Sequence, residues 1–335
     1  MILTRAPLRL GLFGGGSDIP EFYRNNKGVC VSATIDKYIH LAMSRPQYDL
    51  FKIVYSEIEL VKNVDDIKHN IIRETLKLYG ITDKFELSSF ADIPVRGTGL
   101  GSSSTFTVAL AMGCVALKQL RSIVLPEHVK RYLAETACRI EIDMCHQPIG
   151  KQDQYAAAFG GLNKYTFNTD GHVDVEPVKL GCDVEKLESR MMLFYTGVVR
   201  NAEDILKSQF VGDKSIQYTK ELVALAEESV QVLEQGNVDL FGEMLDTGWK
   251  YKKMINPLTS SSVIDHAYDL AKDRGAVGGK IVGAGGGGYL LLFCDPKFQQ
   301  DVRESMEGLG YTQYSFKFEN RGCDILYRGC DILYG

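Results

Sequence analysis

Three glycine-rich stretches are the parts of this sequence best suited to holding a ligand. The first is Gly14-Gly15-Gly16-Ser17-Asp18, the second runs from Gly97 to Ser104, and the third runs from Gly278 to Gly288. They contain three, three and seven of the 33 glycines in the 335-residue chain. Because glycine loses more backbone entropy on folding than other residues, each cluster indicates a sharp turn or a close approach of backbone to a ligand.

The second stretch, Gly97-Thr98-Gly99-Leu100-Gly101-Ser102-Ser103-Ser104, leads directly into an apolar segment with a helical pattern. The N-terminus of a helix presents free N–H groups and a partial positive charge, and glycines let a phosphate reach them. Serine hydroxyls add hydrogen-bond donors or a metal ligand. This combination is typical of a site for a phosphate chain, and a loop that only caps the helix is the alternative.

The third stretch contains Gly283, Gly285 and Gly288 in the spacing G-x-G-x-x-G. In dinucleotide-binding proteins a helix follows this spacing, whereas here Tyr289 to Phe293 predicts a strand. A nicotinamide-dependent oxidoreductase is therefore disfavoured. We expect these glycines to lie between two strands, where they could pack against the phosphate-binding stretch and leave room for its ligand.

The first stretch follows Arg9 and ends in a carboxylate, Asp18. Its glycines bring backbone close to a ligand, and an aspartate carboxylate suits the hydroxyl groups of a sugar. The more common alternative is a turn in which the aspartate caps the helix that follows.

The strands and helices that position these stretches are predicted from hydrophobic patterns. Strands are expected at residues 2–13, 29–44, 52–61, 85–91, 161–178 (a hairpin), 191–195, 278–283, 289–294 and 313–319. Helices are expected at residues 19–25, 65–79, 102–120, 127–144, in three segments of 201–273, and at 298–309. Because no sustained β-α-β alternation is present, we predict a mixed α+β fold. A polar stretch at 181–188 indicates two domains, 1–185 and 186–335.

Composition and charge exclude several classes of protein. A formal net charge of −5 provides no basic surface for nucleic acid, and the apolar runs are too short to span a membrane. The N-terminus lacks the long apolar core of a signal peptide. Eight scattered cysteines without a C-x-x-C pair favour a reducing compartment, the cytoplasm. Residues 321–327 are repeated without change at 328–334, which we interpret as a short duplication with no functional role.

Taken together and in this order, the three stretches resemble motifs of the GHMP small-molecule kinases, a family that includes galactokinase, homoserine kinase and mevalonate kinase. The likeness extends over nearly the whole chain and rests on residues 5–18, 94–104 and 280–288. Within the family, the D-glycero-D-manno-heptose 7-phosphate kinases are similar at residues 35–38, 150–155 and 195–202. The resemblance implies the GHMP kinase fold, with an N-terminal domain like ribosomal protein S5 domain 2 and a ferredoxin-like C-terminal domain.

The resemblance also implies a reaction. A phosphoryl group would pass from ATP to the anomeric hydroxyl of D-glycero-D-manno-heptose 7-phosphate, in the biosynthesis of nucleotide-activated heptose. ATP and Mg²⁺ are the implied cofactors. The implied partners are the sugar phosphate and ATP, with neither nucleic acid nor membrane, and a homodimer is left open as the assembly.

Roles for single residues follow from the same resemblance. Asp153 would act as the catalytic base or position the acceptor hydroxyl, and Arg9 or Lys151 would stabilise the transferred charge. Ser103 and Glu141 would hold Mg²⁺, with Asp143 as a lesser candidate. The residues expected to contact ATP are Gly97, Gly99, Leu100, Gly101, Ser102, Ser103, Ser104, Gly285 and Gly286. Those expected to contact the sugar phosphate are Gly15, Gly16, Ser17, Asp18 and Arg200.

Structural and functional alternatives stand beside these roles. Glu141 could lie on the solvated face of a helix, and Asp153 could cap one. The protein could be a kinase for a free sugar such as fucose, or an inactive protein that senses sugar and ATP. Retention of Ser103, Glu141 and Asp153 argues against the inactive sensor. Galactokinases carry Glu-His where this chain has Gly15-Gly16, which disfavours galactose.

Overall fold

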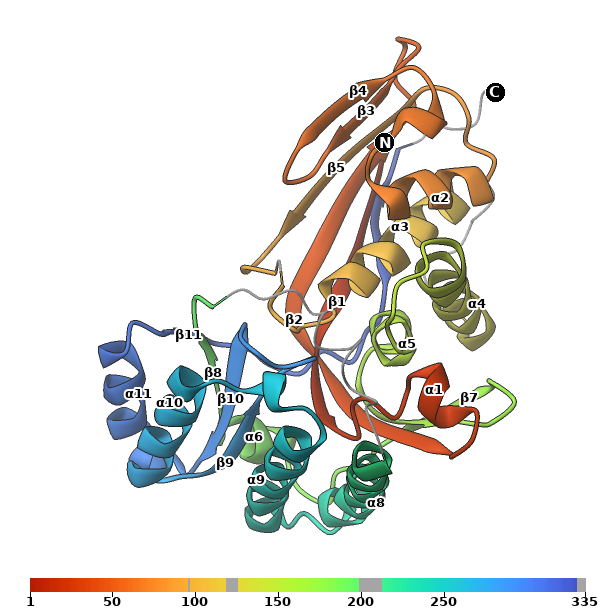
Figure 1. Ribbon diagram of the computed structural model, residues 1–335. Coiled ribbons are helices and arrows are strands. Elements are labelled where there is room, and N and C mark those ends of the chain that lie inside the picture. Colours follow the sequence, from red (N-terminus) through yellow and green to blue (C-terminus); the bar gives the residue numbers. More distant parts are fainter. Residues whose placement is uncertain (96, 119–125, 199–212, 330–335) are drawn as a thin grey trace.

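Two β-sheets, of eight and four strands, organise the chain in a computed structural model that describes residues 1–95, 97–118, 126–198 and 213–329 (Figure 1). The larger sheet contains β1 (Ile2–Phe13), β2 (Gly28–Ser44), β3 (Phe51–Val54), β4 (Ile58–Val61), β5 (Phe85–Ala91), β6 (Leu162–Phe167), β7 (Val173–Pro177) and β12 (Asp324–Arg328). Its strand order is β12-β1-β2-β5-β3-β4, with β6 also paired to β2 and β7 paired to β6. The smaller sheet contains β8 (Met191–Tyr195), β9 (Ala276–Ile281), β10 (Tyr289–Cys294) and β11 (Thr312–Tyr314), in the order β11-β8-β10-β9.

Helices cover both sheets. They are α1 (Pro20–Tyr23), α2 (Asn70–Leu78), α3 (Ser102–Lys118), α4 (Glu127–Cys138), α5 (Gln152–Phe159), α6 (Val184–Glu188), α8 (Asp213–Glu234), α9 (Val238–Ile255), α10 (Ser262–Asp273) and α11 (Gln299–Gly308). The helices α2 to α5 lie along the larger sheet, whereas α9, α10 and α11 accompany the smaller one (Figure 1). None of the helices in the described ranges is both long and apolar enough to cross a membrane. The seven cysteines in these ranges are free thiols.

The antiparallel pair of β1 and β2 connects the two halves of the molecule. Their register runs from Ile2 opposite Met43 to Phe13 opposite Val31. From Ala6 onward every residue of β1 is buried, because α3 and α5 contact the strand from one part of the chain and α8 and α9 from another. A buried strand holds its side chains in fixed positions, and β1 carries Arg9 and ends directly before the first glycine stretch.

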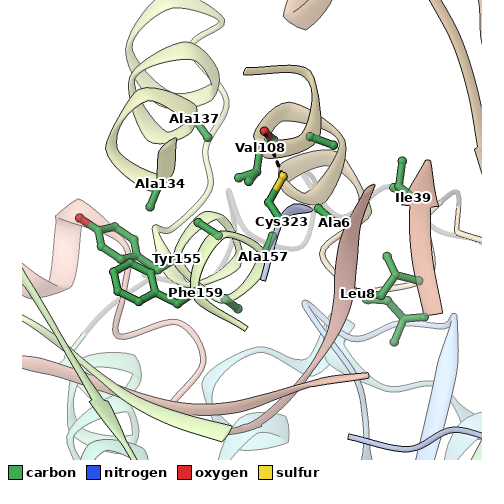
Figure 2. Packing of buried hydrophobic residues seen from close by; sticks show 14 of the residues in the cluster. Ala6, Leu8, Ile39, Val108, Ala134, Ala137, Tyr155, Ala157, Phe159 and Cys323 are labelled. Atoms are coloured by element: carbon green, nitrogen blue, oxygen red, sulfur yellow. Dashed lines mark hydrogen bonds between the residues drawn. The ribbon is translucent and has the colours of Figure 1, made fainter. Parts of the chain in front are cut away.

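The core beside β1 is built around α3. Thirteen of the 17 residues of α3 are buried, as expected for a helix that is apolar on all sides. Figure 2 shows Ala134 and Ala137 of α4 near the rings of Tyr155 and Phe159 of α5, where small side chains leave room for aromatic ones. This packing fixes α3 and α5, whose first turns border the site described below.

The smaller sheet shares this core. Every residue of β10 is buried, and side chains alternate between the two faces of a strand. Leu290 and Leu292 belong to the cluster that contains Tyr268 of α10 and Met306 of α11, whereas Leu291 and Phe293 belong to the core of the larger sheet. The two sheets are therefore held together by apolar contacts.

The sequence predicted most elements at their observed places, and the α+β class is confirmed. The helix expected at 65–79 is shorter and begins at Asn70. The carboxylate of Glu59 accepts the backbone N–H groups of Lys68 and His69 at 2.6 and 3.2 Å. The residues before them form a short 3₁₀ helix, Val64–Asp66, which is separate from α2.

The C-terminal segment returns to the larger sheet. The strand expected at 313–319 ends at Tyr314, and Phe318 then forms an isolated bridge with Ile35. The strand β12 pairs with β1, so the described chain after Tyr314 contacts the N-terminal half, and the division into 1–185 and 186–335 stays a prediction.

The first copy of the seven-residue repeat supplies β12. Cys323 and Ile325 are buried, and the Cys323 thiol donates to the carbonyl of Val108 on α3 at 3.9 Å (Figure 2). A methyl group at Gly322 would lie 2.1 Å from the carbonyl oxygen of Ala158. The first copy therefore has a structural role, while the second, which begins at Arg328, falls mostly outside the described residues.

Candidate active site

A cavity of about 250 Å³ lies where the three glycine-rich stretches meet. Of the residues expected to act on a ligand, it is lined by Arg9, Gly15, Gly16, Asp18, Gly97, Gly99, Gly101, Ser102, Ser103, Ser104 and Asp153. A larger cavity of about 610 Å³ lies beside β6 and β7, and none of these residues line it. The chemistry expected from the sequence is therefore assigned to the smaller cavity.

An ion pair between Arg9 on β1 and Asp153 on α5 lines this cavity. Arg9 Nε donates to Asp153 Oδ1 at 2.8 Å and Nη2 donates to Oδ2 at 2.7 Å, while Nη1 donates to the carbonyl of Gly99. Two parallel hydrogen bonds fix the plane of the carboxylate. Asp153 lies in the first turn of α5 and Lys151 occupies the cap position, so Asp153 is a partner of Arg9 and not a helix cap.

The loop that precedes α3 requires glycine. Gly97, Gly99 and Gly101 have φ angles of 66°, 82° and 76°, in the left-handed region that side chains disfavour. Because α3 begins directly after this loop, the free N–H groups of its first turn lie at the cavity. Leu100 does not line the cavity: its side chain is fully buried, and its carbonyl accepts the N–H of Arg9 at 3.1 Å.

The third glycine stretch packs against this loop, as expected. A methyl group at Gly283 would lie 2.4 Å from the Cα of Gly99, and one at Gly288 would lie 2.2 Å from the carbonyl oxygen of Thr98. No side chain fits at such distances, so the contact between the two stretches depends on glycine at both positions.

Gly285 and Gly286 lie against Thr259. A methyl group at Gly285 would be 2.6 Å from Thr259 Cγ2, and Gly286 N–H donates to the Thr259 carbonyl at 2.6 Å. From this stretch, Lys280, Gly283 and Ala284 line the cavity. A direct contact of Gly285 and Gly286 with a nucleotide stays a prediction.

Glu141 lies in a π-helical turn, Arg139–Met144, that follows α4. Such turns insert one residue into a helix and are frequent at functional sites. Glu141 is fully buried, and its Oε1 accepts the hydroxyl of Ser103 at 2.8 Å while Oε2 accepts the amide of Gln154 at 2.7 Å. It is therefore not on a solvated face, and burial raises its pKa to about 7 despite these hydrogen bonds.

Asp18 joins the first glycine stretch to the start of α5. Its carboxylate accepts the N–H of Gly16 at 3.0 Å and that of Gln152 at 3.1 Å, and burial raises its pKa. Ser17 is fully buried, and its hydroxyl donates to the carbonyl of Val29 at 3.1 Å. This bond attaches the first glycine stretch to β2. Asp18, and not Ser17, lines the cavity.

Three further residues expected at the site, Lys151, Asp143 and Arg200, are not placed in the cavity. The Nζ atom of Lys151 donates to the carbonyl of Gly171 at 2.8 Å and lies 4.9 Å from the centre of the Tyr23 ring. Lys151 and Asp143 line a separate cavity of about 390 Å³. Arg200 lies outside the described residues.

The sequence did not single out Gln152, Gln154, Lys252 or Lys280. Gln152 Nε2 is buried without a partner among the described residues, and Gln152, Lys252 and Lys280 line the cavity. A lysine within the otherwise apolar strand β9 could have indicated that Lys280 has a functional role. The sequence contained no such indication for Lys252, because lysines also occupy positions 250 and 253 and a run of lysines is typical of a solvated helix face.

Comparisons with known proteins point to one family. The family model described as GHMP kinases N terminal domain matches residues 48–161, and the one described as GHMP kinases C terminal matches residues 223–311. The chain is 31% identical to the D-glycero-alpha-D-manno-heptose 7-phosphate kinase of Campylobacter jejuni, over 96% of this chain and 97% of that protein. It is 25% identical to the galactokinase of Pyrococcus furiosus, over 94% of this chain and 95% of that protein.

A solved structure of a sugar-phosphate kinase has a similar fold. The crystal structure of a D-glycero-D-manno-heptose 1-phosphate kinase from Bacteroides thetaiotaomicron matches with a TM-score of 0.79 and 25% sequence identity. The match covers 98% of this chain and 100% of that chain.

Gly288→Ala tests the contact between the second and third stretches. The added methyl group would push Thr98 away and displace the phosphate loop, so we expect kcat/KM for ATP to fall roughly 10- to 100-fold. Gly310→Ala is the matched control, because Gly310 has a similar φ of 81° but nothing within 4 Å of a built methyl group. Steady-state kinetics that show wild-type ATP dependence for Gly288→Ala would contradict the contact.

Proposed function

This chain belongs to the GHMP kinase family and is an ATP-dependent sugar kinase, and we propose that it phosphorylates the anomeric C1 hydroxyl of D-glycero-D-manno-heptose 7-phosphate. The product would be the 1,7-bisphosphate. The observation that carries the proposal is one cavity in which the Arg9–Asp153 pair lies beside the N-terminus of α3. The heptose 7-phosphate kinase that is 31% identical over 96% of the chain supports the choice of acceptor.

Transfer of a phosphoryl group requires positioning and charge stabilisation more than covalent chemistry. We expect the ATP phosphates at the N-terminus of α3, where free N–H groups and the helix dipole stabilise negative charge. Asp153 Oδ2 accepts the proton of the acceptor hydroxyl as its oxygen attacks the γ-phosphorus. The bond between the γ-phosphorus and the oxygen that bridges it to the β-phosphate breaks. ADP leaves with the electron pair of that bond on this oxygen. Arg9 keeps the Asp153 carboxylate in one orientation.

Ser103 and Glu141 are the residues we propose for Mg²⁺. Their side-chain oxygens are 2.8 Å apart, and both are hard donors of the kind that Mg²⁺ prefers. No group of three His, Cys, Asp or Glu residues in the described ranges could hold a metal ion. Two protein ligands suffice, because Mg²⁺ in kinases takes its other ligands from substrate phosphates and water. When bound, the ion neutralises charge on the transferred phosphoryl group.

We propose an adjoining cavity of about 550 Å³ for the adenine base. It shares Gly97, Ser102 and Ser103 with the first cavity. Its aromatic lining consists of Tyr55, His69, Phe90 and Phe106. Nδ1 of His69 is buried without a partner among the described residues, so it can bond to the edge of a base. Aromatic side chains with a small number of polar groups suit a flat heterocycle.

An inactive sensor is disfavoured by the same geometry. Ser103 and Glu141 are in contact, and Asp153 lines the same cavity as Ser103. A protein that only bound sugar and ATP would not need a carboxylate such as Asp153 positioned as a base beside the ATP phosphates.

A coupled ADP-release assay with several acceptors tests the proposed function. The panel is D-glycero-D-manno-heptose 7-phosphate, the free heptose, mannose, fucose and galactose. We expect the highest kcat/KM with the heptose 7-phosphate, and ³¹P NMR of the product should show a second phosphate on C1. A higher kcat/KM with fucose than with the heptose 7-phosphate would show that the proposed acceptor is wrong and that the protein is a free-sugar kinase. ATP binding without turnover of any sugar would instead make the protein a sensor.

The protonation of Glu141 should control Mg²⁺ affinity. Its pKa is raised to about 7, so the neutral acid dominates below pH 7 and the carboxylate above it. We therefore expect Mg²⁺ to bind more weakly at pH 6 than at pH 8, measured by calorimetry with a non-hydrolysable ATP analogue. Glu141→Gln should bind weakly at both pH values, whereas Asp143→Asn, in the separate cavity, should match wild type. Equal affinities of wild type at pH 6 and 8 would exclude Glu141 as a ligand.

A further inference from the structure

Two lysines of the C-terminal half line the active-site cavity without a carboxylate partner. Lys252 extends from α9, is partly buried, and donates to the carbonyl of Gly283. Lys280 extends from β9, is 8% exposed, and donates to the carbonyl of Leu12 at 3.0 Å. Within the described ranges, neither ammonium group forms an ion pair with an Asp or Glu.

This arrangement is unfavourable without an anion. Buried charges are normally paired, because removal of an ion from water costs several kcal/mol. Burial and the neighbouring Lys280 and Arg9 lower the pKa of Lys252 well below its usual value, and burial and Arg9 lower that of Lys280 to about 8. A dianionic ligand would supply the missing negative charge.

Arg9 does not need that ligand. Both oxygens of Asp153 already neutralise the charge of Arg9, and its Nη1 donates to the carbonyl of Gly99. The uncompensated positive charge of the cavity therefore belongs to Lys252 and Lys280.

The position of Lys280 distinguishes it from the expected ATP site. The ATP phosphates are expected at the N-terminus of α3, beside Ser103 and Glu141. Lys280 instead contacts Leu12 at the end of β1, directly before the first glycine stretch. Asp18 of that stretch acts electrostatically on Lys252. Lys280 therefore lies toward the acceptor end of the cavity. Lys252 lies near Lys280 and donates to the carbonyl of Gly283, in the third glycine stretch.

We propose that Lys252 and Lys280 bind the phosphate group that the acceptor sugar already carries, and so select sugar phosphates over free sugars. The inference rests on the proposed function in requiring a phosphorylated acceptor, but it does not depend on which sugar that is. Unlike Arg200, the residue expected from the sequence to bind this phosphate, both lysines lie within the described residues.

Binding of inorganic phosphate tests the site without any sugar. The wild-type protein is first saturated with Mg²⁺ and a non-hydrolysable ATP analogue, so that the nucleotide site is filled. Phosphate should then raise Tm, and Lys252→Met and Lys280→Met should lose this shift. Lys250→Met is the control, because Lys250 is exposed and pairs with Asp246. The proposal would be overturned if phosphate did not raise the Tm of the wild type, or if it raised the Tm of both lysine variants as much as that of the wild type.

Kinetics with a matched pair of sugars give the second test. For D-glycero-D-manno-heptose 7-phosphate, each variant should lower kcat/KM about 10- to 100-fold, the range for loss of a charged hydrogen bond. For the heptose without phosphate, the loss should be much smaller, and the KM for ATP should not change. Equal losses with both sugars would assign the lysines to the transferred phosphoryl group and overturn the proposal.

The two tests distinguish the two proposals. If the wild type binds phosphate through these lysines but does not turn over the heptose 7-phosphate, the proposed acceptor fails and the lysine site stands.

Methionine keeps the length of the lysine stem while removing its charge, so the variants should fold with an unliganded Tm no lower than that of wild type. An ATP-analogue Tm shift equal to that of wild type confirms that each variant is folded.

Discussion

The ion pair between Arg9 and Asp153 is the contact on which the rest of the site depends. Two donor groups of Arg9 hold the Asp153 carboxylate, and a third reaches the carbonyl of Gly99. One side chain therefore ties together β1, α5 and the loop before α3. Catalysis by a carboxylate requires that its position be fixed before the substrate arrives. The buried strand β1 and the packed helix α5 supply that rigidity.

The distribution of charge explains how a chain with a net charge of −5 can hold two phosphorylated ligands. The overall field does not attract them, so local positive groups must do so. At one end of the cavity these are the free N–H groups of α3. Lys252 and Lys280, which line the same cavity and have no carboxylate partner within the described residues, are the groups that we propose for the second ligand. Asp153 already neutralises Arg9, which lies on the same cavity.

Local patterns predicted most of the fold and much of the site. Apolar alternation predicted β2, and the glycine stretches indicated which loops meet at the cavity. Features that depend on distant contacts were not predictable. The π-helical turn that brings Glu141 to Ser103 has no sequence signal, and the burial of Lys252 is concealed by its neighbouring lysines. Nor did the seven-residue repeat predict β12, which forms a strand because β1 offers an edge on which it can pair.

The most direct test of the central claim is the rate of Asp153→Asn. Asparagine keeps the shape of the side chain and one acceptor for Arg9, but it is a far weaker base. If Asp153 accepts the proton of the acceptor hydroxyl, kcat should fall by about 100- to 10,000-fold, while calorimetry should show ATP affinity close to wild type. A kcat within a few-fold of wild type, with the Arg9 contact and ATP binding retained, would contradict the role of Asp153 in the transfer.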